Sequence, residues 1–95
     1  MLNLRDNNLF VEDVSFESLA ESFGTPCYVY SKHDLVKEFQ EYQEAFKDYP
    51  DTTICYSVKA NSNLSILKIF NSMGSGFDIV SEGELERVMR VGADP

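Results

Sequence analysis

Basic side chains and long apolar runs are both scarce in this sequence. Its 8 lysine and arginine residues face 16 aspartate and glutamate residues, which gives a formal net charge of -8 at pH 7. An acidic chain without a basic patch is a poor partner for nucleic acid or an anionic membrane. No apolar stretch approaches the length of a membrane span, and the first residues lack the basic-then-apolar pattern of a secretory leader. We therefore expect a soluble, cytoplasmic protein.

Residues that bind metals or act as nucleophiles are also few. His33 is the one histidine, so neither a zinc cluster nor a histidine-based triad can be assembled from this chain. It stands at the start of a polar helical segment, where we expect a solvated side chain. Cys27 and Cys55 lack the spacing of a metal site or a disulfide framework. Both fall in segments typical of strands, so we expect buried thiols and no metal.

The length limits the chain to one small domain at most. Hydrophobic residues make up 43% of its 95 residues and charged residues 25%, which are ordinary values for a globular protein. A chain this short buries only a modest fraction of its surface. We expect a thin core.

The N-terminal part predicts one short amphipathic helix. Residues 1–14 indicate only a possible short strand at residues 9–11. Ser15 is a candidate N-cap, and Gly24 is a candidate C-terminal stop. Between them the apolar residues recur at helical spacing, at Phe16, Leu19, Ala20 and Phe23.

The next segment predicts a strand followed by a longer helix. Residues 27–30 are rich in tyrosine and valine, which is typical of a strand. Ser31 is a candidate cap for a helix, with Asp34 three residues later in the capping-box position. The pattern predicts that this helix continues to about Tyr49 and stops at Pro50.

The rest of the chain alternates strands and helices. The expected elements are a strand at residues 52–58, a helix from Asn61 or Ser62, a strand at residues 77–80, and a helix from a Ser81–Glu84 capping box to Gly92. Alternation with short connections is typical of a parallel sheet. Two such strands cannot close a barrel or cover their own edges. The α/β pattern therefore predicts the opening of a (β/α) barrel, in a truncated chain or a piece of a longer protein.

Lys59 lies at the end of the first of these two strands. Period-2 alternation places it on the same face as Thr53, Cys55 and Ser57, which are small side chains that leave room for a ligand. Lysine forms Schiff bases with carbonyl compounds when its amine is partly neutral. Position alone, however, favours a solvated strand end for Lys59, because most lysines that end strands are solvated.

Three motifs in this chain resemble the diaminopimelate decarboxylases. They are GTPCYVY at residues 24–30, YSVKAN at residues 56–61 and GFDIVSEGEL at residues 76–85. The resemblance implies an alanine-racemase-like (β/α) TIM barrel joined to a β-rich domain. It implies that residues 1–30 contribute to the β-rich domain and that residues 31–95 begin the barrel. It also implies decarboxylation of meso-diaminopimelate to lysine with pyridoxal 5'-phosphate as cofactor, in a homodimer.

The resemblance also implies roles for four residues. Lys59 matches the lysine that holds the cofactor covalently, which agrees with its position at a strand end. Asp78 is a candidate to hold or orient the Lys59 ammonium, or it is an acid that caps the next turn. Glu84 matches an acid that lies behind the cofactor in related decarboxylases, although its capping box also explains it. Asn61 is a candidate to hydrogen-bond within the site or to cap a helix.

Related proteins offer alternatives for the function. Alanine racemase has a similar lysine motif, but a different sequence follows it. Decarboxylases of ornithine, arginine or carboxynorspermidine resemble the GFD region, and a pyridoxal-phosphate-binding barrel without enzymatic activity is a further possibility. The phosphate-binding loop, ring partners and substrate ligands of the family fall after the matched region. We therefore expect the isolated chain to be inactive and, with open strand edges, to self-associate.

Overall fold

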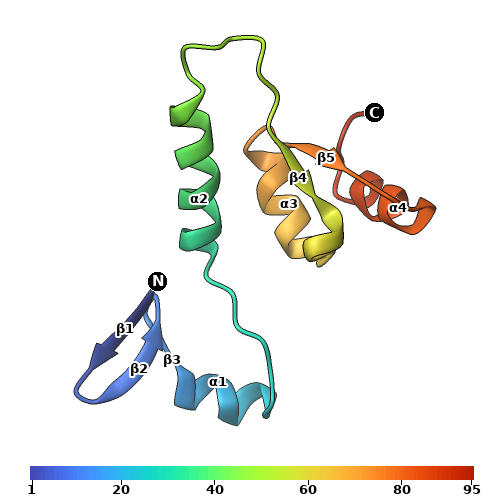
Figure 1. Ribbon diagram of the computed structural model, residues 1–95. Coiled ribbons are helices and arrows are strands. Elements are labelled where there is room, and N and C mark those ends of the chain that lie inside the picture. The colour runs from blue at the N-terminus through green and yellow to red at the C-terminus, as the bar shows by residue number, and fades with distance from the viewer. The chain divides into compact units, whose positions relative to one another are not determined.

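The computed structural model describes all residues from 1 to 95, and the chain divides into two compact units (Figure 1). The first unit comprises residues 1–35 and the second residues 36–95. The boundary falls inside α2 (Lys32–Ala45), five residues after the expected boundary between residues 30 and 31. Whether the first segment belongs to a β-rich domain stays a prediction.

The first unit begins with a small antiparallel sheet. Its strands are β1 (Leu2–Arg5), β2 (Asn8–Val11) and β3 (Val14–Ser15), in the order β1-β2-β3. Asp6 and Asn7 connect β1 to β2 with positive φ angles of 51° and 65°. Positive φ at both central residues is typical of a type I′ hairpin, whose twist matches that of the strands. The possible strand at residues 9–11 is confirmed as part of β2, while the other two strands were missed.

The helix α1 (Phe16–Phe23) follows the sheet directly. Ser15 is its N-cap, because the Ser15 side chain accepts a hydrogen bond from the Ser18 backbone N–H at 3.1 Å. Gly24 ends the helix with a φ of 79°. Both ends are as predicted.

Residues 27–30 do not form the expected strand. They have no ladder partner among the strands of this chain, and the Tyr28 side chain is 90% exposed. A strand requires a neighbour that accepts and donates its backbone hydrogen bonds. Cys27 is correspondingly exposed, so the expectation of a buried thiol is wrong for this residue.

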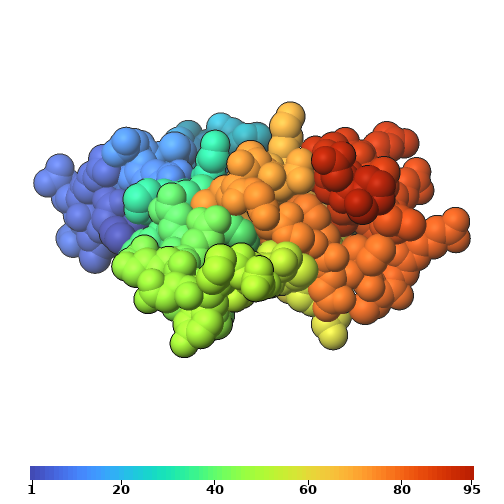
Figure 2. Space-filling model, turned by 90° about the horizontal axis from the view of Figure 1, so that it is seen from above, coloured from blue at the N-terminus to red at the C-terminus, as the bar shows by residue number.

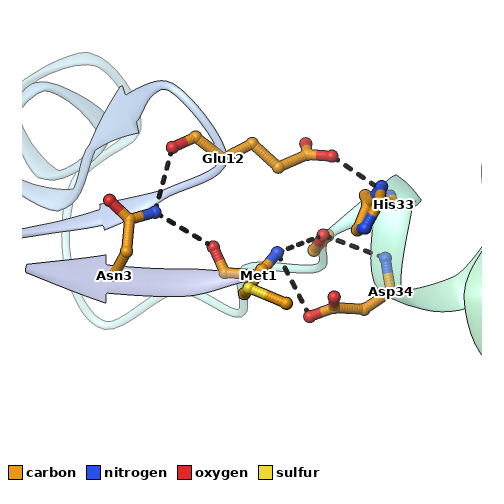
Figure 3. A network of polar contacts seen from close by, with 6 residues as sticks. Met1, Asn3, Glu12, His33 and Asp34 are labelled. Atoms are coloured by element: carbon orange, nitrogen blue, oxygen red, sulfur yellow. Dashed lines mark hydrogen bonds and ion pairs between the residues drawn. The ribbon is translucent and has the colours of Figure 1, made fainter.

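A polar network joins the hairpin to the start of α2 within the first unit (Figure 3). The Ser31 hydroxyl caps α2 by accepting from the Asp34 N–H at 3.2 Å, as predicted. Instead of completing a capping box, the Asp34 carboxylate lies 3.2 Å from the amino group of Met1. The His33 backbone N–H donates to Glu12 Oε1 at 3.1 Å, and the His33 side chain is exposed as expected.

The second helix ends four residues earlier than predicted. Its last residue is Ala45, whereas the sequence pattern indicated Tyr49. The Phe46 N–H still bonds to the carbonyl four residues back, but the Lys47 and Tyr49 N–H groups bond three residues back. The chain therefore passes into successive tight turns before Pro50 rather than continuing the helix.

The second unit is built on two parallel strands, β4 (Cys55–Ser57) and β5 (Gly76–Asp78), joined through α3 (Leu64–Ser72). The predicted parallel pairing is confirmed, with Cys55, Tyr56 and Ser57 opposite Gly76, Phe77 and Asp78. Both strands are shorter than predicted. The first expected strand loses residues 52–54 and Val58, and the second loses residues 79–80 but gains Gly76.

The core of the second unit lies beneath this sheet. Val58, Leu67 and Val88 form a buried cluster, and Leu67 and Val58 are 0% exposed. Helix α4 (Glu82–Arg90) supplies Val88, and Figure 2 shows the residues of α3, β5 and α4 packed against one another. Beside the cluster, the Phe70 ring lies 4.5 Å from the Tyr56 ring and 5.8 Å from the Phe39 ring, between centroids. This aromatic contact attaches α2 to α3 within the unit.

The two helices that follow the strands begin at side-chain caps. Helix α3 begins after Asn63 and not after the expected Asn61 or Ser62, because Asn63 Oδ1 accepts from the Ser65 N–H at 2.9 Å. Helix α4 begins after Ser81, as predicted. No helix in the chain is both long enough and apolar enough to span a membrane.

Candidate functional site

The candidate site lies at the carboxyl ends of the two parallel strands. Ser57 ends β4 opposite Asp78, which ends β5, and Lys59 follows Ser57 by two residues. Carboxyl ends of parallel strands meet at one edge of a sheet, where α/β proteins place their ligands. The fold therefore brings the segment carrying Lys59 and the end of the strand carrying Asp78 to the same edge.

Lys59 belongs to a 3₁₀ turn, Val58–Ala60, and not to the strand. The backbone leaves the strand after Ser57, so the strand ends one residue earlier than predicted. Val58 remains in the core at 0% exposure while Lys59 is exposed. The place of Lys59 just beyond a strand end is confirmed, and its sharing of a face with Cys55 and Ser57 stays a prediction.

The amine of Lys59 is free of protein partners. Its Nζ takes part in no hydrogen bond or ion pair of the structure. Asp78 is likewise exposed and forms no ion pair with Lys59. The expectation that Asp78 holds the Lys59 ammonium has no counterpart in this structure, and any role of Asp78 toward a ligand stays a prediction.

Asn61 makes hydrogen bonds that shape the connection between β4 and α3. Its backbone carbonyl accepts from the Tyr56 hydroxyl at 2.8 Å. Its side-chain Oδ1 accepts from the Asn63 N–H at 3.0 Å, immediately before the cap of α3. Asn61 therefore orders the backbone just before α3, while the helix cap expected at Asn61 is made by Asn63. Its contact with a cofactor stays a prediction.

Glu84 and Ser81 together cap α4 as predicted, although the Glu84 carboxylate accepts from the Val80 N–H in place of the Ser81 N–H of a capping box. The Glu84 backbone N–H donates to the Ser81 hydroxyl oxygen at 3.1 Å. Its carboxylate accepts from the Val80 N–H at 3.3 Å and from the Ser81 hydroxyl at 3.2 Å. Both carboxylate oxygens are thus used locally, so the capping function is confirmed while a place behind a cofactor stays a prediction.

A shallow apolar groove of about 320 Å³ lies beside β4. It is lined by Glu38, Phe39, Tyr42, Ile54, Cys55, Tyr56, Ser57 and Phe70. Cys55 is exposed there, which corrects the second expectation of a buried thiol. Neither Lys59 nor Asp78 lines this groove. The groove therefore lies beside the segment of Lys59, with Ser57 in its lining, and does not include the lysine itself.

Sequence reasoning missed the contribution of Tyr56 to this region. Tyr56 is half-buried, and its ring packs on Phe70. Its hydroxyl, however, reaches past the core to the Asn61 carbonyl. No short-range sequence signal announces a bond of this kind, because it depends on the 3₁₀ turn that brings Asn61 back toward the strand.

Residues 32–95 match a family model described as "Pyridoxal-dependent decarboxylase, pyridoxal binding domain". The match covers β4, β5 and the segment that carries Lys59. It agrees with the family resemblance and the pyridoxal cofactor expected from the motifs.

Individual relatives are similar over almost the whole chain. A diaminopimelate decarboxylase of Neisseria meningitidis serogroup A is 57% identical over 86 residues, which is 90% of this chain and 21% of that protein. A crystal structure of an Aquifex aeolicus protein superposes with a TM-score of 0.88 and 46% identity, covering 96% of this chain and 22% of that one. A crystal structure of an M. jannaschii diaminopimelate decarboxylase in complex with L-lysine superposes with a TM-score of 0.89 and 35% identity. This match covers 96% of this chain and 22% of that one. The chain therefore spans about a fifth of the length of the curated relatives it matches.

Proposed function

This chain belongs to the family of pyridoxal-dependent decarboxylases, and we propose that it forms the N-terminal part of a diaminopimelate decarboxylase. The observation that carries the proposal is the 57% identity to a diaminopimelate decarboxylase over 90% of this chain. The reaction of the whole protein is the loss of carbon dioxide from meso-diaminopimelate to give L-lysine. The L-lysine bound in the M. jannaschii relative fits the product of this reaction.

The chemistry of Lys59 fits pyridoxal 5'-phosphate. When bound, this cofactor supplies an aldehyde that condenses with an amine, and a pyridinium ring that accepts the electron pair left on the substrate carbon when carbon dioxide departs. The residue that holds the aldehyde must therefore offer an accessible primary amine. Lys59 offers one that is exposed and free of hydrogen bonds and ion pairs. Exposure alone does not single out one lysine, since Lys32 and Lys68 are exposed too, so we assign the covalent attachment to Lys59 because YSVKAN at residues 56–61 resembles the family's cofactor-lysine motif.

The remaining site residues would act around this amine. Lys59 Nζ would hold the cofactor aldehyde and, as a primary amine, would also be able to give or take up a proton beside it. The Asp78 carboxylate, exposed at the end of β5, would orient Lys59 or a ligand at the edge of the sheet that the two segments share. Asn61 would order the backbone after Lys59, and Glu84 would add negative charge near the ligand. Each of these roles extends the family's motif to this chain residue by residue.

The proposal extends to the setting of the whole protein. Residues 31–95 would open an alanine-racemase-like barrel, and residues 1–30 would contribute to a β-rich domain. The intact protein would be a cytoplasmic homodimer. The two parallel strands with one intervening helix are consistent with the first part of a barrel.

The substrate is tested by carbon dioxide release from the full-length protein loaded with pyridoxal phosphate. We expect release from meso-diaminopimelate and much slower release from ornithine, arginine and carboxynorspermidine. A preference for one of the other three would replace diaminopimelate as the substrate. No release from any of them, with the cofactor still bound, would favour the carrier without enzymatic activity.

The assignment of Lys59 is tested separately by borohydride reduction of the loaded protein and peptide mass mapping. We expect a pyridoxyl group on Lys59, and its complete loss in Lys59→Ala. Lys68→Ala is the matched control, because Lys68 is another exposed lysine of the same unit. A pyridoxyl group on another lysine, with Lys59 unmodified, would refute the assignment.

A further inference from the structure

The segment that carries Lys59 is closed by a hydrogen bond from a neighbouring side chain. The Tyr56 hydroxyl donates to the Asn61 carbonyl oxygen at 2.8 Å. Tyr56 lies three residues before Lys59 and Asn61 two residues after it, so the bond encloses the 3₁₀ turn Val58–Ala60. The bond therefore closes a backbone loop that contains Lys59, whose side chain is exposed.

The hydroxyl is held in place by the packing of its ring. Tyr56 is half-buried, and its ring centroid lies 4.5 Å from that of the buried Phe70. Phe70 in turn packs on Phe39 at 5.8 Å. A ring fixed between core residues has few orientations, so its hydroxyl meets the carbonyl at little further loss of entropy.

The far end of the loop is ordered as well. Asn61 Oδ1 accepts from the Asn63 N–H at 3.0 Å, and Asn63 Oδ1 accepts from the Ser65 N–H at 2.9 Å. These two bonds join the loop to the first turn of α3. The Tyr56 hydroxyl is therefore the contact that connects this ordered segment back to the strand before the lysine.

We propose that Tyr56 is a positioning residue for Lys59, through its hydroxyl bond to the Asn61 carbonyl. The inference rests on the proposed function, in which Lys59 holds the cofactor. Without the hydroxyl, the turn would open more often and Lys59 Nζ would spend less time in the orientation that meets the cofactor aldehyde. Because a net hydrogen bond is worth about 1 kcal/mol, the effect on covalent attachment is about fivefold.

The test uses the full-length protein with the substitution Tyr56→Phe, which keeps the ring and removes only the hydroxyl. Tyr42→Phe is the matched control, because the Tyr42 side chain is exposed and its hydroxyl has no hydrogen-bond partner. Each cofactor-free protein is titrated with pyridoxal phosphate, reduced with borohydride and mapped. The concentration that gives half-maximal adduct on Lys59 should rise about fivefold in Tyr56→Phe and stay unchanged in Tyr42→Phe.

A spectroscopic readout separates positioning from a general loss of stability. The visible absorbance of the Lys59-linked cofactor is followed against pH in all three proteins. The pH at which half of the absorbance change has occurred should shift in Tyr56→Phe alone. Far-UV circular dichroism confirms that each protein is folded. A midpoint pH and a half-maximal concentration in Tyr56→Phe equal to those of the unsubstituted protein would overturn the positioning role while leaving the function intact. No adduct on Lys59 even in the unsubstituted protein would overturn both.

Discussion

Replacing Gly76 with alanine should destabilise the second unit through one contact, with the Cys55 side chain. Gly76 lies opposite Cys55 in the parallel register, and a Cβ added to Gly76 would lie 2.6 Å from Cys55 Sγ. Favourable carbon contacts begin near 3.5 Å, so either the thiol must rotate or the strands must shift. Because Cys55 is exposed, its Sγ can rotate away, and an unfavourable rotamer costs about 0.5–1.5 kcal/mol. Loss of glycine flexibility in the unfolded chain offsets about 0.4–1 kcal/mol of that. We expect a net loss of up to about 1 kcal/mol.

The same substitution should reverse its sign in a Cys55→Ala background. With Sγ removed, the nearest atoms to the new Cβ are Thr53 Cγ2 at 3.5 Å and the residue 55 Cβ at 3.7 Å, which are ordinary contacts. The only remaining effect is then the lower conformational entropy of the unfolded chain, so Gly76→Ala should stabilise by about 0.4–1 kcal/mol. Urea denaturation of the single and double variants, followed by far-UV circular dichroism, gives the coupling energy. Equal effects of Gly76→Ala in the two backgrounds, within about 0.5 kcal/mol, would refute the reasoning.

Three further predictions concern the core, a helix cap and the exposed surface. Leu67→Ala should destabilise by about 2–5 kcal/mol because Leu67 is 0% exposed, and a loss below about 1 kcal/mol in urea denaturation would contradict its place in the core. Ser81→Ala removes the N-cap of α4 and should lower stability by about 1 kcal/mol, whereas Ser72→Ala, at the exposed end of α3, should lower it less. The isolated chain should self-associate through its exposed apolar side chains, and a monodisperse monomer in concentrated solution by light scattering would count against this.

The helix starts were the most predictable features of the fold. Ser15, Ser31 and Ser81 were each expected to cap a helix, and each side chain accepts a backbone N–H three residues later. A cap is a contact between neighbours in sequence, so the residue types that make it are visible without any knowledge of tertiary structure. The parallel pairing of β4 and β5 followed from the order of elements for a similar reason.

The errors fall where structure depends on distant partners or on unusual backbone angles. The N-terminal hairpin was missed because Asp6 and Asn7 form its turn without the Asn-Gly or Asp-Gly pair that usually signals one. Residues 27–30 have the composition of a strand, but the strands of this chain provide them with no neighbour. The exposure of Cys27 and Cys55 has the same origin, because burial depends on what covers a strand and not on its sequence.

The candidate site was predicted in its location but not in its detailed geometry. Strand order was sufficient to place the Lys59 segment and Asp78 at one edge of the sheet. The 3₁₀ turn at Val58, the Tyr56–Asn61 bond and the absence of a Lys59–Asp78 ion pair could not be inferred. All three follow from where the backbone leaves the strand, which the β-rich composition of residues 52–58 concealed.

The backbone on both sides of Lys59 is held in place by contacts within the chain. Val58, the residue before it, is fully buried against Leu67 and Val88, so the backbone at that point cannot move without disturbing the core. After the lysine, the Asn61 carbonyl is held by the Tyr56 hydroxyl. A flexible side chain is thus mounted on a backbone segment that is ordered by packing at one end and by a hydrogen bond at the other. Since these contacts lie within residues 36–95, this unit itself supports the lysine, whatever surrounds it in a longer protein.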